Sequence, residues 1–199
     1  MPLIVFEGID GCGKSTQLAC LAGRLRAQGR EPLVLREPGG TALGERIRDI
    51  LLDPVTAACA TAELLAYQVA RAQLVEEALR PALAAGRVVL LDRFWYSTIA
   101  YQAYGLGCDL RRVRAAIDLA IDGLRSDRAL YLRIAASIAE ARRAAAGADR
   151  IEARGLRYLE RVVDGYESLV GTGELQALDA ERSEDRVAEA VWAAVAGVV

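Results

Sequence analysis

The 199-residue sequence contains no histidine, one methionine and a single lysine, Lys14, among its 25 basic residues. Without histidine the chain cannot build a Ser-His-Asp triad, a Cys-His dyad or an imidazole metal site. A Schiff-base enzyme would have to use Lys14 alone. The net charge of −2 argues against a general nucleic-acid-binding protein, so we expect no nucleic-acid partner.

The sequence also lacks signals for export and for membrane insertion. Its start, MPLIVFEG, has neither the basic region nor the long apolar run of a secretory signal. No stretch of 18 apolar residues is free of charge, and the four cysteines form no C-x-x-C pair. We therefore expect a cytoplasmic protein with no membrane partner, folded as a single domain over residues 1–199.

Short apolar segments alternate along the chain with segments of helical periodicity, which predicts an α/β fold with a parallel sheet. The predicted strands cover residues 2–7, 32–36, 87–91, 128–134 and 175–179. The predicted helices cover residues 14–28, 41–52, 60–85, 109–122, 136–146 and 153–170, with a last helix capped by Ser183. Because ligands bind beyond the carboxyl ends of parallel strands, the chemistry should lie just after each predicted strand.

The segment after the first predicted strand, GIDGCGKS from Gly8 to Ser15, matches the phosphate-binding pattern G-x-x-x-x-G-K-[ST]. Its glycines let backbone N–H groups turn towards a polyphosphate, and the following helix adds its positive end. Lys14 would neutralise the β- and γ-phosphates, and Ser15 would offer a hydroxyl to Mg²⁺. The residues expected to bind the nucleotide are Gly8, Asp10, Gly11, Cys12, Gly13, Lys14, Ser15 and Thr16.

The remaining motifs narrow the class of nucleotide-binding protein. A GTPase would need N-K-x-D, which cannot occur because the only lysine lies in the phosphate loop. Asp92 and Arg93 follow the third predicted strand, where a Mg²⁺-binding carboxylate belongs. Tyr67 and Arg71 lie four residues apart on one helix face, where they could hold a planar base or form an ordinary cation–π pair.

Five segments in order, FEGIDGCGKSTQ, REPGGT, ELLAYQVARAQLVEEALRPAL, DRFWYST and ADRIE, resemble the thymidylate kinase family. The resemblance implies a P-loop NTPase fold of three layers, with a five-stranded parallel sheet in the order 2-3-1-4-5. It implies transfer of the γ-phosphoryl group of ATP to dTMP with Mg²⁺, in a homodimer packed through the region of residues 109–122. The alternatives are another nucleoside monophosphate kinase and a nucleotide-binding regulator without turnover.

The resemblance also assigns roles in acceptor binding. Asp10 would hold the 3′-hydroxyl end of dTMP, while Arg93 and Arg48 would bind its phosphate. Arg71 would read the edge of thymine, and Tyr67 would stack on the base where the family usually has phenylalanine. Ser97 and Thr98 would lie near the base, and Tyr101 would crowd the sugar 2′ position.

The family supplies its catalytic arginine either from the phosphate loop or from a mobile lid over ATP. The phosphate-loop position is Gly11 here, so the chain resembles the bacterial branch with a lid arginine, and we expect the lid at about residues 142–152. Two lid positions usually carry arginine; Arg143 fills the first, but the second is Ala145, for which Arg142 could stand in. The expected catalytic residues are Lys14, Asp92, Arg93, Arg143 and Arg150.

Overall fold

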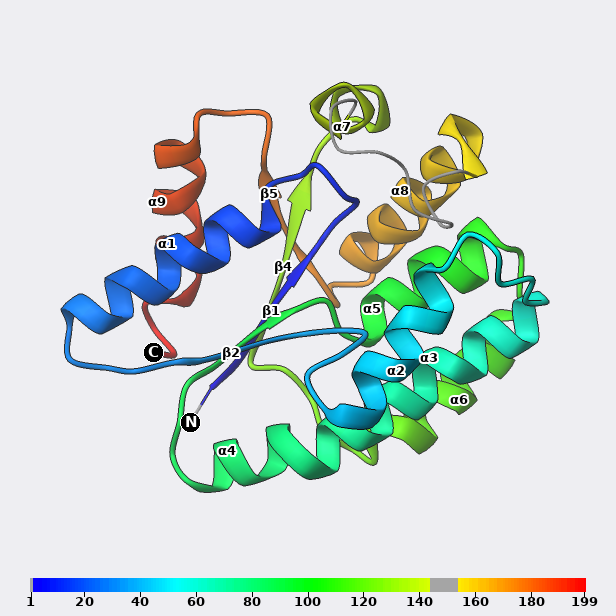
Figure 1. The fold of residues 1–199 in the computed structure, drawn as a ribbon. Helices are drawn as coiled ribbons and strands as arrows, with labels where there is room; N and C mark the ends of the chain where they lie inside the picture. Colours follow the sequence, from blue (N-terminus) through cyan, green and yellow to red (C-terminus); the bar gives the residue numbers. More distant parts are fainter. Residues whose placement is uncertain (1, 144–153) are drawn as a thin grey trace.

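The computed structural model describes residues 2–143 and 154–199. In this part of the chain five parallel strands form one sheet in the order β2-β3-β1-β4-β5, which confirms the expected order (Figure 1). The strands are β1 (Leu3–Glu7), β2 (Leu33–Arg36), β3 (Val89–Asp92), β4 (Arg128–Arg133) and β5 (Gln176–Asp179).

The middle strand β1 is buried over its whole length because helices cover both faces of the sheet. In the register of the sheet, Asp92 of β3 lies opposite Phe6 of β1 and Arg36 of β2. The carboxyl ends of these three strands therefore meet at one edge. The residues that follow them are brought together there, as the sequence predicts.

Helices α1 (Lys14–Ala27) and α9 (Glu184–Val195) cover one face of the sheet (Figure 1). On the other side lie α2 (Ala42–Leu52), α3 (Ala60–Leu74), α4 (Arg80–Ala84), α5 (Trp95–Thr98), α6 (Leu110–Ile121) and α8 (Leu156–Gly171). Helix α7 (Ala136–Arg143) follows β4. None of the described helices is both long and apolar enough to cross a lipid bilayer.

The helix expected over residues 60–85 is interrupted by a π-helical turn, η1 (Val75–Leu79), which joins α3 to α4. Pro81 lies in the first turn of α4, where its missing N–H removes a helical hydrogen bond and its ring crowds the preceding turn. The wider π-helical turn accommodates that ring without breaking the helix.

The structure adds two further details on the helices. Residues 95–105 form α5 and a π-helical segment, η2 (Ile99–Gly105), although the sequence analysis assigned no helix there. Ser183 occupies the N-cap position of α9, but its side chain makes no capping hydrogen bond. The negative side chains of Glu184 and Asp185 in the first turn favour the helix N-terminus instead.

Candidate active site

Two adjoining cavities open at the carboxyl edge of the sheet. The larger, of about 700 Å³, is lined by residues 10–17 and by side chains that follow β2 and β3. The smaller, of about 100 Å³, is lined by side chains of α3, α5 and η2. Four residues line both cavities, namely Asp10, Glu37, Arg48 and Arg93. These four side chains are therefore within reach of a ligand bound in either cavity.

The phosphate loop turns sharply between β1 and α1. Gly8 has φ +139°, and a Cβ atom there would lie 2.7 Å from the Sγ atom of Cys12 and 2.9 Å from the carbonyl oxygen of Leu132. Gly13 has φ +95° at the start of α1. Only glycine adopts such conformations readily. Of the residues expected to bind nucleotide, Asp10 to Thr16 line the larger cavity, whereas Gly8 packs beneath the loop.

Lys14 lies beneath the phosphate loop rather than extending into solvent. Its Nζ atom donates to the carbonyl oxygens of Gly8 and Ile9 at 3.0 and 3.3 Å, and to Oδ1 of Asp10 at 3.3 Å. The buried ammonium therefore remains next to the backbone that would surround a polyphosphate.

Arg93 lies at the junction of the two cavities with φ +68°, an uncommon value for a residue other than glycine. Its guanidinium donates to Oδ1 of Asp10 at 2.7 Å and to the hydroxyl of Tyr101 at 3.3 Å. It also donates to Oγ of Ser97 at 3.2 Å and to the hydroxyl of Tyr166 at 3.3 Å. These contacts hold a fixed cation beside both cavities.

Asp10 remains a carboxylate in this setting. Burial raises the pKa of Asp10, but the charges of Arg93 and Lys14 outweigh burial and hold that pKa well below its usual value. The carboxylate therefore links the two cations of the site, one at the phosphate loop and one at the junction.

The sequence analysis did not identify Glu7, although it ends the first strand, where chemistry was expected. Glu7 is fully buried and accepts hydrogen bonds from the backbone N–H of Phe94 at 2.7 Å, the hydroxyl of Ser97 at 2.5 Å and the hydroxyl of Tyr166 at 3.0 Å. Burial raises the pKa of Glu7, which these hydrogen bonds and the charge of Arg93 partly oppose. Tyr166, on α8, was also missed.

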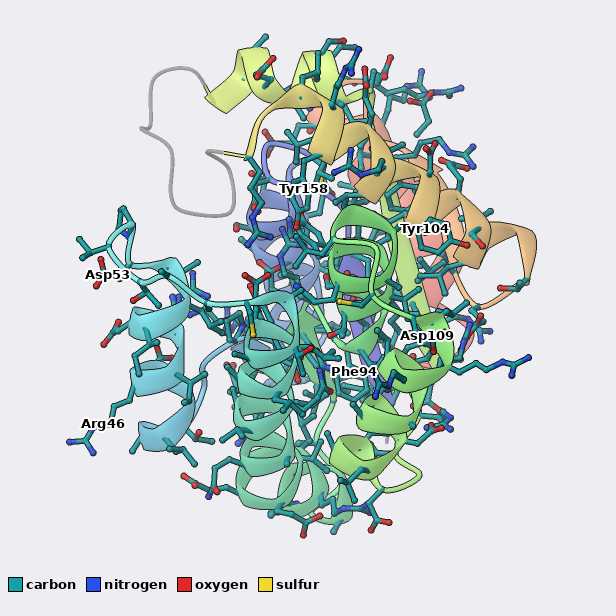
Figure 2. All side chains as sticks on the ribbon, turned by 90° about the vertical axis from the view of Figure 1, so that its right-hand side faces the viewer. Arg46, Asp53, Phe94, Tyr104, Asp109 and Tyr158 are labelled. Carbon is teal, nitrogen blue, oxygen red and sulfur yellow. The ribbon has the colours of Figure 1, made fainter. Side chains whose placement is uncertain are left out.

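Arg71 lies at the back of the smaller cavity with only 2% of its surface exposed. Its Nε and Nη2 atoms donate to Oε2 of Glu37 at 2.8 and 2.6 Å, and Nη2 also donates to the carbonyl oxygen of Phe94. Nη1 donates to Oε1 of Gln68 and to Oγ1 of Thr98. The ring beneath the guanidinium is that of Phe94, which is fully buried and is labelled in Figure 2.

Comparison with known proteins decides which family this site belongs to. The family model described as thymidylate kinase matches residues 6–191. The chain belongs to the thymidylate kinase family. It is therefore a kinase that transfers a phosphoryl group from ATP to dTMP, and the two alternatives left open by the sequence are not favoured.

Curated thymidylate kinases from several bacteria are similar over most of their length. The thymidylate kinase of Synechococcus sp. (strain RCC307) is 45% identical over 195 residues, which cover 94% of this chain and 92% of that protein. The thymidylate kinase of Desulforudis audaxviator is 44% identical, over 96% of this chain and 89% of that protein. The thymidylate kinase of Caldanaerobacter subterraneus is 44% identical, over 84% and 80% respectively.

The residues expected to bind the acceptor of a thymidylate kinase gather around the smaller cavity. Those that line it are Asp10, Arg48, Tyr67, Arg71, Arg93, Ser97, Thr98 and Tyr101. Arg48 reaches it from α2, where its Nη1 atom donates to the carbonyl oxygen of Pro38 at 2.9 Å. Glu37 and Gln102 also line this cavity, and the sequence analysis assigned neither of them a role.

Part of the expected lid lies outside the described residues, including Ala145 and Arg150. Arg143 ends α7, and its side chain is likewise outside the description. Arg142 lines the larger cavity and donates to the carbonyl oxygen of Ala180 at 3.3 Å. Arg182, to which the sequence analysis gave no role, lines the same cavity.

Proposed function

We propose that phosphoryl transfer takes place at the junction of the two cavities. ATP would place its phosphates on the loop in the larger cavity, and dTMP would occupy the smaller one. The observation that carries this proposal is that Arg93 and Asp10 line both cavities and are hydrogen-bonded to each other.

The acceptor preference is tested by ADP release over a panel of nucleoside monophosphates in a coupled assay. We expect dTMP to react fastest. Equal rates with dTMP and AMP would contradict the assignment of the smaller cavity to thymine.

In this proposal different side chains of the smaller cavity contact the base, the sugar and the phosphate of dTMP. Tyr67 would stack on the base, Arg71 would lie at the base edge and Tyr101 would crowd the sugar 2′ position. Arg93 and Arg48 would bind the acceptor phosphate through the paired donors that suit phosphate oxygens. Asp10 would accept a hydrogen bond from the 3′-hydroxyl.

Asp92 and Ser15 are the residues that would hold Mg²⁺. The Oδ1 atom of Asp92 is buried without a hydrogen-bond partner among the described residues, and both side chains line the larger cavity. One carboxylate and one hydroxyl, with phosphate oxygens and water, suit the octahedral preference of Mg²⁺. The ion, when bound with ATP, would neutralise charge on the transferred phosphoryl group.

Phosphoryl transfer depends mainly on alignment and on neutralising charge, which guanidinium and ammonium groups perform. Lys14 lies at the donor phosphates and Arg93 between donor and acceptor in this arrangement. Arg143 and Arg150 of the lid segment would add positive charge over ATP. No imidazole base is needed, because the acceptor phosphate is already an anion.

We also propose that the chain forms a cytoplasmic homodimer through α2, α3 and α6. Large apolar side chains on these helices are exposed, and the exposed fractions are 53% for Ile50, 52% for Leu65, 45% for Val69 and 85% for Leu119. Burying such side chains against a second copy would remove apolar surface from water. This supports the association that the family resemblance implies.

A further inference from the structure

We propose that two buried carboxylates, Glu7 and Glu37, are positioning residues that separately fix the two ends of the acceptor nucleotide. Glu37 acts on the base end through Arg71, and Glu7 acts on the phosphate end through Arg93. The inference rests on the proposed placement of dTMP in the smaller cavity, and it adds the residues that hold its two arginines in place.

At the phosphate end, two hydroxyl groups bridge Glu7 and Arg93. Ser97 and Tyr166 each lie within hydrogen-bond distance of Oε2 of Glu7 and of Nη1 of Arg93. Because an arginine only donates and a carboxylate only accepts, each hydroxyl gives its hydrogen to Glu7 and offers a lone pair to Arg93. Glu7 therefore orients both acceptors that hold Nη1.

Glu7 also fixes the backbone beside Arg93. Its Oε1 atom accepts the N–H of Phe94, the residue that follows Arg93, and the N–H of Arg93 donates to the carbonyl oxygen of Phe6. These two bonds hold Arg93 at its positive φ, a conformation that surrounding contacts must maintain.

At the base end, Glu37 contacts Arg71 directly. Oε2 of Glu37 accepts from both Nε and Nη2, and the ion pair is almost completely buried. The other oxygen, Oε1, is buried without a hydrogen-bond partner among the described residues. Nη1 of Arg71 donates to Gln68 and Thr98, so all five N–H groups of the guanidinium are engaged and a bound base would replace one of these acceptors.

Stability alone does not account for these carboxylates. Removing a carboxylate and a guanidinium from water costs free energy that their attraction often fails to recover, and an unpartnered buried oxygen adds to that cost. The same contacts do hold the guanidinium groups in one orientation, which a binding site needs to within about 0.5 Å. Positioning is therefore the role that fits the geometry.

The two networks use different side chains. Glu37, Arg71, Gln68 and Thr98 form one, and the other runs from Glu7 through Ser97 and Tyr166 to Arg93. The backbone of Phe94 takes part in both, because its N–H donates to Glu7 and its carbonyl oxygen accepts from Arg71. The two ends of the acceptor site can therefore be weakened one at a time.

The test compares binding of dTMP with binding of thymidine, which has the same base and sugar but no phosphate, by titration calorimetry. Glu7→Gln is expected to weaken dTMP binding by about 10-fold or more, and to weaken thymidine binding less, because thymidine reaches Arg93 only through Asp10 at the 3′-hydroxyl. Glu37→Gln is expected to weaken both ligands by similar factors of about 10-fold or more. Kinetically, each effect should raise KM for dTMP more than it lowers kcat.

Two further variants keep the test decisive if either glutamine variant fails to fold. Tyr166→Phe removes one bridging hydroxyl and should weaken dTMP binding more than thymidine binding. Glu37→Asp keeps the charge but shortens the reach to Arg71, and should weaken both ligands. The matched control is Glu174→Gln, since Glu174 forms a two-point ion pair with Arg114 and lines neither cavity; both affinities should stay unchanged.

Arg93→Ala and Arg71→Ala separate failure of the inference from failure of the proposed site. If Arg93→Ala does not weaken dTMP more than thymidine, or Arg71→Ala does not weaken both ligands, the placement of dTMP is wrong. If the arginine variants behave as expected but the glutamate variants only lower Tm, or change both ligands by the same factor at both positions, the positioning roles are overturned.

Discussion

At the scale of single residues, the geometry around position 14 explains why the one lysine of this arginine-rich chain occurs there. Lys14 places a compact ammonium within 3.3 Å of two backbone carbonyl oxygens and of Oδ1 of Asp10, beneath the phosphate loop. A planar guanidinium spreads its donors over a fork and would not fit that position. Arginine serves instead at Arg71 and Arg93, where several acceptors surround the fork.

Asp10 should make stability depend on pH in the acid range. Its pKa is lower in the folded protein than in the unfolded chain, so its ionisation stabilises the fold above the unfolded pKa and is lost as pH falls through the folded one. We expect Asp10→Asn to flatten the pH dependence of the free energy of unfolding below about pH 4. Urea unfolding at several pH values measures this, with the exposed Asp164→Asn as control; parallel curves for Asp10→Asn and wild type would contradict it.

Cys12 should be inert despite its place in the phosphate loop. The residue is 2% exposed and burial raises the pKa of its thiol, so little thiolate is available. Iodoacetamide should label the exposed Cys59 and leave Cys12 unmodified and the kinase active, as read by peptide mass spectrometry and ADP release. Rapid labelling of Cys12 in the native protein would show that the loop opens, and the same reaction in denaturant provides the control.

The residues of the site were only partly predictable. The phosphate loop and Asp92-Arg93 are local patterns at strand ends, and each lines a cavity as expected. Glu7 meets Tyr166 across 159 positions of the chain, and Glu37 meets Arg71 across 34. Such pairs depend on how α3 and α8 pack against the strand ends, which no local pattern reveals.

At the scale of elements, the strands were predictable because each is a short apolar run between glycine- or charge-rich turns. Residues 95–105 were not, because WYSTIAYQAYG is rich in aromatic and β-branched residues, which have a low intrinsic preference for helix. Tertiary packing prevails there: Gly105 approaches Tyr158 and Gly165 approaches Ala100 so closely that a Cβ atom would clash. Close contact with α8 thus holds η2 in its helical form.

The lid segment carries a prediction of its own. Arg150→Ala should lower kcat more than it weakens ATP binding, because a contact made mainly to the transferring phosphoryl group strengthens in the transition state. Steady-state kinetics with varied ATP, together with nucleotide binding, separates the two effects. Arg157→Ala, at an exposed position on α8, is the matched control. A raised KM with unchanged kcat would assign Arg150 to ordinary ground-state binding.

At the scale of the whole molecule, the sheet brings three strand ends to one edge, and α2, α3 and α6 each expose large apolar side chains on their outer surface. The same helix α3 carries Tyr67 and Arg71 towards the smaller cavity and Leu65 and Val69 towards solvent. A second copy packed on that outer surface would restrain the helix that lines the base end of the site. Association of two copies and binding of the acceptor would then both depend on helix α3.

Leu119→Arg should convert the proposed homodimer to a monomer. Leu119 is 85% exposed on α6, and a charge at that position would have to be buried on association. Light scattering after size exclusion at about micromolar concentration gives the mass directly. Ile138→Arg on α7, at another partly exposed apolar position, should leave the dimer intact. A wild-type protein that is already monomeric under these conditions would contradict the proposed interface.

The most direct test of the account is the kcat/KM of Arg93→Ala for dTMP. Arg93 lines both cavities and holds Asp10, so its removal should weaken acceptor binding and phosphoryl transfer together. We predict a fall in kcat/KM of about 100-fold or more, consistent with the loss of several charge-assisted contacts. A value within about threefold of wild type, in a protein with unchanged Tm, would contradict the placement of the reaction at this junction.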